Sequence, residues 1–228
     1  MSMFSVIICS RGKDIPPELQ RSIAETIGVD FELVVIDNSD KDYSIFSAFN
    51  EGVRRSKGEI LCFCHEDILF HSLSWGASIQ KVLSDESIGV VGVIGSHFLP
   101  RAPMYWWSSP YISQYSVNND KGVAQLNDNR EFFHGAVADV VTVDGVCFFI
   151  PRSLFDSIRF DDRTFQGFHL YDMDICMQVQ ALGKRVCVTD VLTIEHFWSE
   201  DSLRNEKYMA VLNHNLELFY HESNSSFF

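Results

Sequence analysis

The feature that most constrains the fold is the alternation of short apolar runs with amphipathic stretches in the first half of the chain. The apolar runs are rich in β-branched residues, as buried strands are, and the stretches between them repeat apolar residues at helical spacing. The strand-like runs are Phe4 to Cys9, Phe31 to Ile36, Glu59 to Cys64 and Ile88 to Ile94, and the helix-like stretches run from Pro16 to the stop at Gly28, from Ile45 to the stop at Gly58, and from Ser72 to Ser84. This alternation predicts an α/β fold with a mainly parallel sheet and helices on both faces.

The second half of the chain is less regular. From Ser96 to Gly135 the pattern dissolves into a segment rich in aromatic residues, Asn and Asp, which is typical of a functional or mobile excursion. Beyond it we expect strands at Val137 to Val143, Gly145 to Ile150 and Arg185 to Val191, and helices at Ser153 to Ile158, around Ile175 to Leu182 and at Ser202 to Glu222. The 228 residues predict a single domain over residues 1–228, in which residues 202–228 form a C-terminal helix and tail.

The charge balance limits what the chain can bind. The formal net charge is −13 and there is no run of lysines or arginines, so the composition excludes a protein that binds nucleic acid through its phosphates alone. An acidic protein that handles phosphorylated molecules needs a local cation to offset its own field. The composition therefore points to a bound metal ion.

We expect the chain to be soluble and cytoplasmic. The six cysteines lie in apolar stretches rather than in a disulfide framework, which fits free thiols in a reducing compartment. Met1 to Ile8 lacks the features of a signal peptide, and no window approaches the roughly 18 apolar residues that span a bilayer. The expectation is at most peripheral membrane contact.

Acidic residues follow two of the expected strands. Asp37 follows the run that begins at Phe31, and Asp67 follows the run that ends at Cys64. Ligands of open α/β sheets bind beyond the carboxyl ends of the strands, so we expect both carboxylates to face one crevice.

Five short motifs, in order and at suitable spacing, give the sequence a resemblance to a known family. They are Ser5-Val6-Ile7-Ile8, Val34-Val35-Ile36-Asp37-Asn38-Ser39, Asn50-Glu51-Gly52 with Lys57-Gly58-Glu59-Ile60, His65-Glu66-Asp67, and Tyr171-Asp172-Met173-Asp174. Together they resemble glycosyltransferase family 2, over roughly Phe4 to Phe197. The resemblance implies the GT-A fold, a nucleotide-sugar donor, and a divalent cofactor, Mn²⁺ or Mg²⁺.

The resemblance also implies a donor pocket. In that family the aspartate after the second strand contacts the nucleobase, and Asp37 matches it. A carboxylate can accept hydrogen bonds from a pyrimidine ring or a ribose hydroxyl. The alternative is that Asp37-Asn38-Ser39 is simply a turn after the strand. The other candidates for donor binding are Ser10, Asn50, His65, Glu66 and Asp144.

The motif after the third strand departs from the family. Most relatives carry Asp-x-Asp there, whereas this chain has His65 in place of the first aspartate and keeps Asp67, the candidate metal ligand. Mg²⁺ prefers oxygen ligands and Mn²⁺ also accepts imidazole, so the change weakens metal binding or favours Mn²⁺. His196 matches a late histidine that often supplies a further ligand, and it can equally be a packed core residue.

The resemblance implies a catalytic base at the start of a late helix. Asp172 matches the aspartate of the family's Glu-Asp motif, and Tyr171 stands where the glutamate usually stands. Asp172 and Asp174 are both also suited to cap the helix, and we expect Asp174 to take that structural role.

The function that the resemblance implies is inverting, metal-assisted transfer of a sugar from a nucleoside-diphosphate sugar, of the UDP type, to a saccharide or lipid-linked acceptor in polysaccharide biosynthesis. Two alternatives remain. One is nucleotidyl transfer, which the lack of a glycine-rich phosphate loop after the first strand disfavours. The other is a non-catalytic carbohydrate- or protein-binding relative, which the departures at His65 and Tyr171 leave open. The aromatic residues from Tyr105 to Tyr115 can stack on sugar rings or simply cover the sheet.

Overall fold

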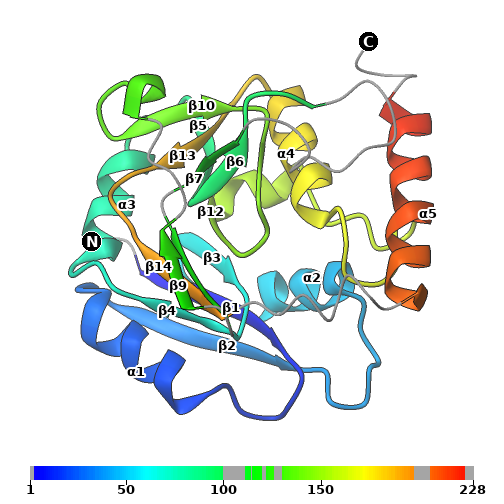
Figure 1. Cartoon of the computed structure of the whole chain (residues 1–228), viewed down its shortest axis with the longest axis horizontal. Coiled ribbons are helices and arrows are strands. Elements are labelled where there is room, and N and C mark those ends of the chain that lie inside the picture. The colour runs from blue at the N-terminus through cyan, green and yellow to red at the C-terminus, as the bar shows by residue number, and fades with distance from the viewer. Residues whose placement is uncertain are drawn as a thin grey trace.

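The computed structural model describes residues 3–99, 111–113, 115–119, 122–125, 130–197 and 206–223. Figure 1 shows a central sheet with helices around it. The strands are β1 (Phe4–Ser10), β2 (Phe31–Asp37), β3 (Ile60–Cys64), β4 (Ile68–Phe70), β5 (Ile88–Gly92), β6 (Ile94–Ser96), β7 (Tyr111–Ser113), β8 (Tyr115–Asn119), β9 (Gly122–Gln125), β10 (Val137–Val140), β11 (Thr142–Val143), β12 (Cys147–Pro151), β13 (Arg185–Thr189) and β14 (Ile194–Phe197). The helices are α1 (Pro17–Thr26), α2 (Ile45–Arg55), α3 (Trp75–Leu83), α4 (Tyr171–Ala181) and α5 (Glu206–Ser223), with 3-10 helices at Arg130–Phe132 and Arg152–Asp156.

The main sheet has seven strands in the order β10-β13-β5-β12-β3-β1-β2. β1 runs parallel to β2 and to β3, and β13 runs parallel to β5. β12 is antiparallel to both of its neighbours, β3 and β5, and β10 is antiparallel to β13. Five strands therefore share one direction, which confirms the expected mainly parallel sheet.

Side chains of β1 show what covers each face of the sheet. Ile7 faces α2, which comes so close that a Cβ on Gly52 would lie 2.3 Å from the Ile7 side chain. Phe4, an odd number of residues away, points to the opposite face and packs edge-on against Trp75 of α3, with ring centroids 5.6 Å apart. Glycine at position 52 is what lets α2 lie this close to the sheet.

The remaining helices extend both layers. α4 lies on the same face as α2, because Tyr171 packs against Phe49 with ring centroids 5.5 Å apart. α1 lies with α3, because the indole N–H of Trp75 donates to Thr26 Oγ1 at 2.9 Å. Helices therefore cover both faces, as the alternation in the sequence predicts.

The carboxyl ends of the central strands form one edge of the sheet. In β1 and β2, Ser10 pairs with Asp37, and β3 ends at Cys64. β12 runs the other way, so its first residue, Cys147, pairs with Cys64. The segment that leads into β12 therefore reaches the same edge as the ends of the parallel strands.

Two smaller sheets were not expected from the sequence. One has the order β4-β14-β8-β9 and the other the order β11-β6-β7. The segment from Ser96 to Gly135 was expected to be irregular, but it contributes β7, β8 and β9, and β8 runs parallel to β14. Such pairing joins segments far apart in the sequence, and local periodicity carries no sign of it. Tyr105, Trp106 and Trp107 lie outside the described residues.

Some element boundaries differ from the expectation. The run Ile88 to Ile94 is divided at Val93 into β5 and β6, which belong to different sheets. Both halves are apolar and buried, so composition gives no signal for the change of partner. Ser153 to Ile158 forms the 3-10 helix Arg152–Asp156 rather than an α-helix. Along the part of the chain that the structure describes, every helix is too short or too polar to cross a membrane.

Candidate active site

The site is built around the end of β3. The backbone N–H of His65 donates to the carbonyl oxygen of Val146 at 3.0 Å, which continues the pairing of β3 with β12. The turn before β12 is held by Asp144, whose Oδ1 accepts the backbone N–H of Val146 at 2.8 Å. Asp144 and Gly145 therefore lie beside His65, although some 80 residues separate them in the sequence.

Strand β14 brings a histidine to the same place. It pairs antiparallel with β4, with His196 opposite Ile68. The backbone N–H of Phe197 also donates to the carbonyl oxygen of Asp67 at 2.9 Å. This pairing sets the His196 side chain against the Asp67 carboxylate.

His65, Asp67 and His196 form a cluster suited to a divalent metal ion. Asp67 Oδ1 lies 3.8 Å from His65 Nδ1 and 3.5 Å from His196 Nε2, and one ligand atom from each residue lies within 4.8 Å of the others. Two ligands of one ion are separated by up to about 4 Å, because each metal–ligand bond is about 2 Å long. Both distances from Asp67 meet this limit, and the two imidazoles come within about 1 Å of it. The residues present therefore fit a metal ion, and a set of two imidazoles and one carboxylate suits Mn²⁺ better than Mg²⁺.

The ionisation of the cluster also suits a metal. Burial, and then the neighbouring His196, lower the pKa of His65, which favours the neutral imidazole that binds metals. Burial opposes the charged form of Asp67, but contact with His196 and the charge of His65 outweigh it and lower the pKa of Asp67. Both groups are held in their ligand form.

The two positions that depart from the family pattern touch each other. His65 Nε2 lies 2.9 Å from the hydroxyl oxygen of Tyr171, at the first residue of α4. Gly145 makes room for this contact, because a Cβ there would lie 2.0 Å from the same hydroxyl oxygen. Each departure is visible in the sequence, but nothing in it shows that the two side chains meet.

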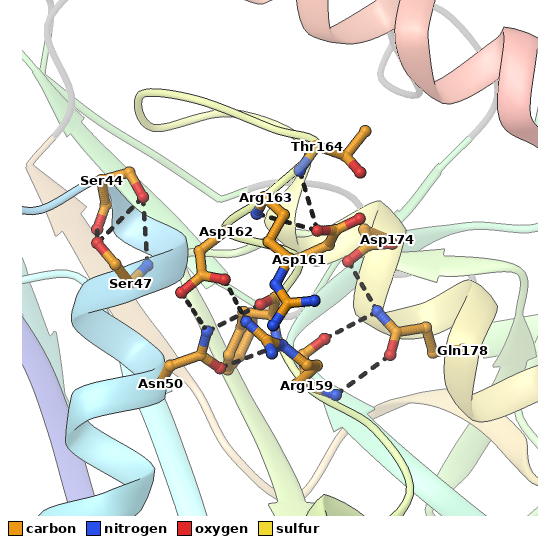
Figure 2. Close-up of polar contacts among 11 residues, drawn as sticks. Ser44, Ser47, Asn50, Arg159, Asp161, Asp162, Arg163, Thr164, Asp174 and Gln178 are labelled. Atoms are coloured by element: carbon orange, nitrogen blue, oxygen red, sulfur yellow. Dashed lines mark hydrogen bonds and ion pairs between the residues drawn. The ribbon is translucent and has the colours of Figure 1, made fainter.

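Asp172 lies next to this contact in the first turn of α4. Its Oδ2 accepts the backbone N–H of Gly145 at 2.9 Å, and its Oδ1 accepts that of Met173 at 2.8 Å. Burial, and then the charge of Asp144, raise the pKa of Asp172 to about 7. A carboxylate with a pKa near neutrality can exchange a proton at physiological pH. Asp174 instead accepts a hydrogen bond from Gln178 at 2.8 Å, on the flank of the helix (Figure 2).

Ser10 and Glu66 fix the loop that follows β1. Ser10 Oγ donates to Glu66 Oε2 at 2.7 Å, and Glu66 also forms an ion pair with the Arg11 guanidinium. The hydrogen bond with Glu66 and, more weakly, the charge of Asp67 raise the pKa of Arg11. Arg11 thus places an exposed cation near an acidic cluster, and it was missed in the sequence because nothing but its position after the first strand marks it.

Asp37 lies at the same edge of the sheet but farther out. It ends β2, is exposed, and accepts the backbone N–H of Ser39 at 3.0 Å. That hydrogen bond lowers the pKa of Asp37. β2 is two strands from β3, which corresponds to about 10 Å at the usual strand spacing. Asp37 therefore does not touch the histidine cluster, and the end of β1, at Ser10, lies between them.

Asn50 was expected to contribute to donor binding, and in the structure its amide group binds the segment before α4. Figure 2 shows its amide group bound to the segment that precedes α4: Nδ2 donates to the carbonyl of Phe160 at 2.8 Å and to Asp162 at 3.2 Å, and Oδ1 accepts the N–H of Phe160 at 3.1 Å. Both amide hydrogens and the carbonyl oxygen are engaged. A motif match cannot reveal this, because the partners lie about 110 residues away.

We expect Asn50→Leu to lower the free energy of unfolding by about 1–3 kcal/mol, because it leaves the buried backbone groups of Phe160 without partners. The affinity for a nucleotide donor should change little once the protein is folded. Chemical denaturation and a nucleotide titration of the same preparation measure the two effects. Glu51→Gln is the matched control, since Glu51 binds Arg54 and Arg55 on the exposed side of the same helix. A variant of Asn50 with unchanged stability and lost donor binding would restore its expected role.

A second asparagine fixes the same segment from the other side. Asn215 of α5 is fully buried, its Nδ2 donates to the carbonyl of Gln166 at 2.7 Å and to that of His169 at 3.2 Å, and its Oδ1 accepts the N–H of Gln166 at 3.3 Å. The N–H of Ile45, at the start of α2, donates to the carbonyl of Gly167 at 2.9 Å. The loop that delivers Asp172 is therefore held by α2 and by α5.

Two curated proteins share part of this sequence. The chain is 26% identical over 157 residues to the streptomycin biosynthesis protein StrF of Streptomyces griseus, covering 67% of this chain and 52% of StrF. It is 27% identical over 164 residues to the protein of ATP synthase subunits region ORF 6 of Fuscovulum blasticum, covering 70% of this chain and 60% of that protein. The chain thus spans between half and two thirds of the length of these relatives.

Solved structures share the fold at low identity. GalNAc-T7, solved with UDP, GalNAc and Mn²⁺, superposes with a TM-score of 0.60 at 11% identity, over 86% of this chain and 44% of that one. S. aureus TarS 1–349, which has also been solved with UDP, superposes with a TM-score of 0.55 at 14% identity, over 92% of this chain and 64% of that one. These likenesses confirm the expected GT-A fold.

The sequence itself decides the family. Residues 5–222 match the sequence profile of the glycosyltransferase-like family, which is nearly the whole chain and includes every element that contributes to the site. This match agrees with the resemblance carried by the five motifs. The chain belongs to the glycosyltransferase-like family.

Proposed function

We propose that this chain is an inverting, metal-assisted glycosyltransferase that moves a sugar from a UDP-type nucleotide sugar to a hydroxyl group of a saccharide or lipid-linked acceptor. The observation that carries the proposal is the meeting of a metal-binding cluster, His65, Asp67 and His196, with the buried Asp172 through the single turn at Gly145. Donor activation and proton removal need these two kinds of group within one site.

In this proposal the donor lies along the carboxyl edge of the sheet. Asp37 accepts a hydrogen bond from the base or the ribose at the end of β2, and the diphosphate lies toward β3. Arg11 lies between these points on the β1 loop, where its cation can offset phosphate charge, and Glu66 and Ser10 hold that loop in place. Asp144 lies beside His65 and is assigned to the donor sugar.

His65, Asp67 and His196 would hold the divalent ion. When bound, such an ion stabilises the negative charge that develops on the departing diphosphate. The lowered pKa values of His65 and Asp67 keep both side chains in the form that binds a cation at neutral pH. GalNAc-T7 carries Mn²⁺ together with UDP, and the imidazole content of the cluster in this chain favours the same ion.

Asp172 would act as the base. It takes the proton of the acceptor hydroxyl while that oxygen bonds to the anomeric carbon and the bond from this carbon to the diphosphate oxygen breaks. A single displacement of this kind inverts the anomeric configuration. The N–H groups of Gly145 and Met173 fix the orientation of the carboxylate, and each of its oxygens keeps a further lone pair for the proton.

The cellular role is also part of the proposal. We propose a cytoplasmic enzyme of polysaccharide or lipid-linked saccharide synthesis with at most peripheral membrane contact, on the basis of the family.

The deciding experiment is a thermal-shift screen of the purified chain against UDP, GDP, CDP, dTDP and their common sugars, each with Mn²⁺, Mg²⁺ or chelator. We expect Mn²⁺-dependent stabilisation by the UDP series, which at 100 times the dissociation constant corresponds to about 2.7 kcal/mol. Stabilisation by another nucleotide would correct the donor and keep the transferase. No stabilisation by any nucleotide under any metal condition would favour the non-catalytic binding relative.

A further inference from the structure

We infer that Tyr171 is a positioning residue for the metal centre: its hydroxyl accepts a hydrogen bond from His65 Nε2–H and so turns the bare Nδ1 of that ring toward Asp67 and His196. The inference rests on the metal site of the proposed function and goes beyond it. It assigns a role to a side chain that departs from the family motif and explains why His65 departs together with it.

The two nitrogens of His65 face different partners. Nε2 lies 2.9 Å from Tyr171 Oη, which is hydrogen-bond distance, whereas Nδ1 lies 3.8 Å from Asp67 Oδ1, which is beyond it. A neutral imidazole carries a hydrogen on only one of its two ring nitrogens. On Nδ1 that hydrogen would have no partner within range at Asp67, but on Nε2 it has one in the tyrosine oxygen. The geometry therefore selects the tautomer in which Nδ1 offers its lone pair to a metal ion.

The position of the tyrosine hydroxyl is set by the core and not by the metal site. The ring of Tyr171 is buried and packs edge-on against Phe46 and Phe49 and at a tilt against Phe148, with ring centroids 5.5 to 6.3 Å apart. These contacts lie on the face of the sheet that α2 and α4 cover. The hydroxyl is thus in place before any metal binds, which is how a partner of a metal ligand fixes the orientation of that ligand.

The turn at Gly145 is shaped to admit this hydroxyl. A side chain there would overlap it, with a Cβ 2.0 Å from the oxygen and 2.2 Å from Cζ of Tyr171. The N–H of the same glycine donates to Asp172. Gly145 therefore makes room for the tyrosine–histidine contact by lacking a side chain, and its backbone N–H anchors the proposed base.

The pair also sets which ion the site prefers. Tyr171 stands where the family motif has a glutamate, and its neutral hydroxyl adds no carboxylate beside the cluster. The cluster itself offers one carboxylate, from Asp67, and two imidazole nitrogens, from His65 and His196. Mn²⁺ tolerates such a set, whereas Mg²⁺ requires mostly oxygen ligands. Orienting His65 therefore raises the affinity for Mn²⁺ more than that for Mg²⁺.

The test is a titration of the full chain with Mn²⁺ alone, followed by electron paramagnetic resonance, with Mg²⁺ competition. We expect Tyr171→Phe to weaken Mn²⁺ binding about 10- to 100-fold and to lower the preference for Mn²⁺ over Mg²⁺, while the retained ring preserves the core. Tyr220→Phe is the matched control, because the Tyr220 hydroxyl is buried and has no hydrogen-bond partner among the described residues. It should leave Mn²⁺ affinity unchanged.

A double-mutant cycle separates positioning from a general structural effect. In a His65→Ala background, Tyr171→Phe should have no further effect on Mn²⁺ affinity, because the ring that it orients is gone. An equal loss in both backgrounds would overturn the inference. So would unchanged Mn²⁺ affinity in Tyr171→Phe alongside lost affinity in His196→Ala, a result that leaves the metal site standing. Absence of Mn²⁺ binding to the unmodified chain would overturn the inference and the metal site together, and the nucleotide screen would then decide whether the chain still binds a donor.

Discussion

Asp172→Asn is expected to lower turnover by about two to four orders of magnitude, the usual contribution of a general base. Asparagine keeps the size of the side chain but cannot take a proton. The affinity for the donor nucleotide should change little, because the proposed donor contacts lie at Asp37 and at the metal cluster. Product formation under saturating donor and acceptor, alongside a nucleotide titration, measures both quantities.

The raised pKa of Asp172 also predicts how turnover changes with pH. Burial and Asp144 raise the pKa of Asp172 to about 7, so the side chain loses its proton as pH rises through neutrality. Turnover should therefore fall below about pH 7 and level off above it, and the residual turnover of Asp172→Asn should lack this step.

Asp174→Asn is the matched control for Asp172. It makes the same substitution two residues along the same helix, at a side chain that binds Gln178. Its turnover should stay close to that of the unmodified chain. If Asp172→Asn also retains turnover while remaining folded, Asp172 is not the base.

Asp67→Ala is expected to abolish the dependence of donor binding on metal and to lower turnover about 10²- to 10³-fold, as loss of a group that stabilises developing charge does. Asp67 supplies the only carboxylate of the cluster and lies within 4 Å of both imidazoles. Calorimetry with UDP in the presence of Mn²⁺ or chelator measures the binding. Chelator should reduce donor binding by the unmodified chain to the level of the variant.

Glu195→Gln provides the control for charge. Glu195 is the neighbour of His196 in β14, its side chain points to the other face of the strand, and it binds His71 at 3.0 Å. The variant removes one negative charge next to His196 without removing a proposed metal ligand.

The outcome that would contradict the assignment of Asp67 is metal-dependent donor binding that survives in Asp67→Ala. It would exclude Asp67 from the metal site.

The sequence was sufficient for the parts of the fold that follow local pattern. The strands are visible as short continuous apolar runs and the helices as stretches of period 3.6, so the positions of β1, β2, β3 and β5 along the chain, and those of α1, α2, α3 and α4, could be predicted. The carboxyl ends of these strands then gave the prediction that the site lies near Asp37 and Asp67. What local pattern could not give was the partner of each strand: β14 pairs with β4 and with β8, and this pairing is what brings His196 to Asp67.

The candidate site residues also fall into those that the sequence indicated and those whose contacts only the structure shows. Asp67, His196 and Asp172 were found by their motifs, and their assignment stays a proposal. The motif gave no sign of the contact between Asn50 and Phe160, since a residue type at the right spacing says nothing about a partner about 110 residues away. His65 and Tyr171 were each read as a loss relative to the family. Only their contact at 2.9 Å shows that the two side chains form one interaction.

The hydrogen bonds that Asn50 and Asn215 make to the loop before α4 have a consequence for which residues of that loop can vary. Asn50 and Asn215 hold the loop before α4 mainly through its backbone, so the path of the loop depends little on its outward side chains. Arg163 and Phe168 are exposed on that loop. They could be exchanged for other residues without moving the aspartate that follows. Variation at these two positions is therefore uncoupled from the placement of Asp172.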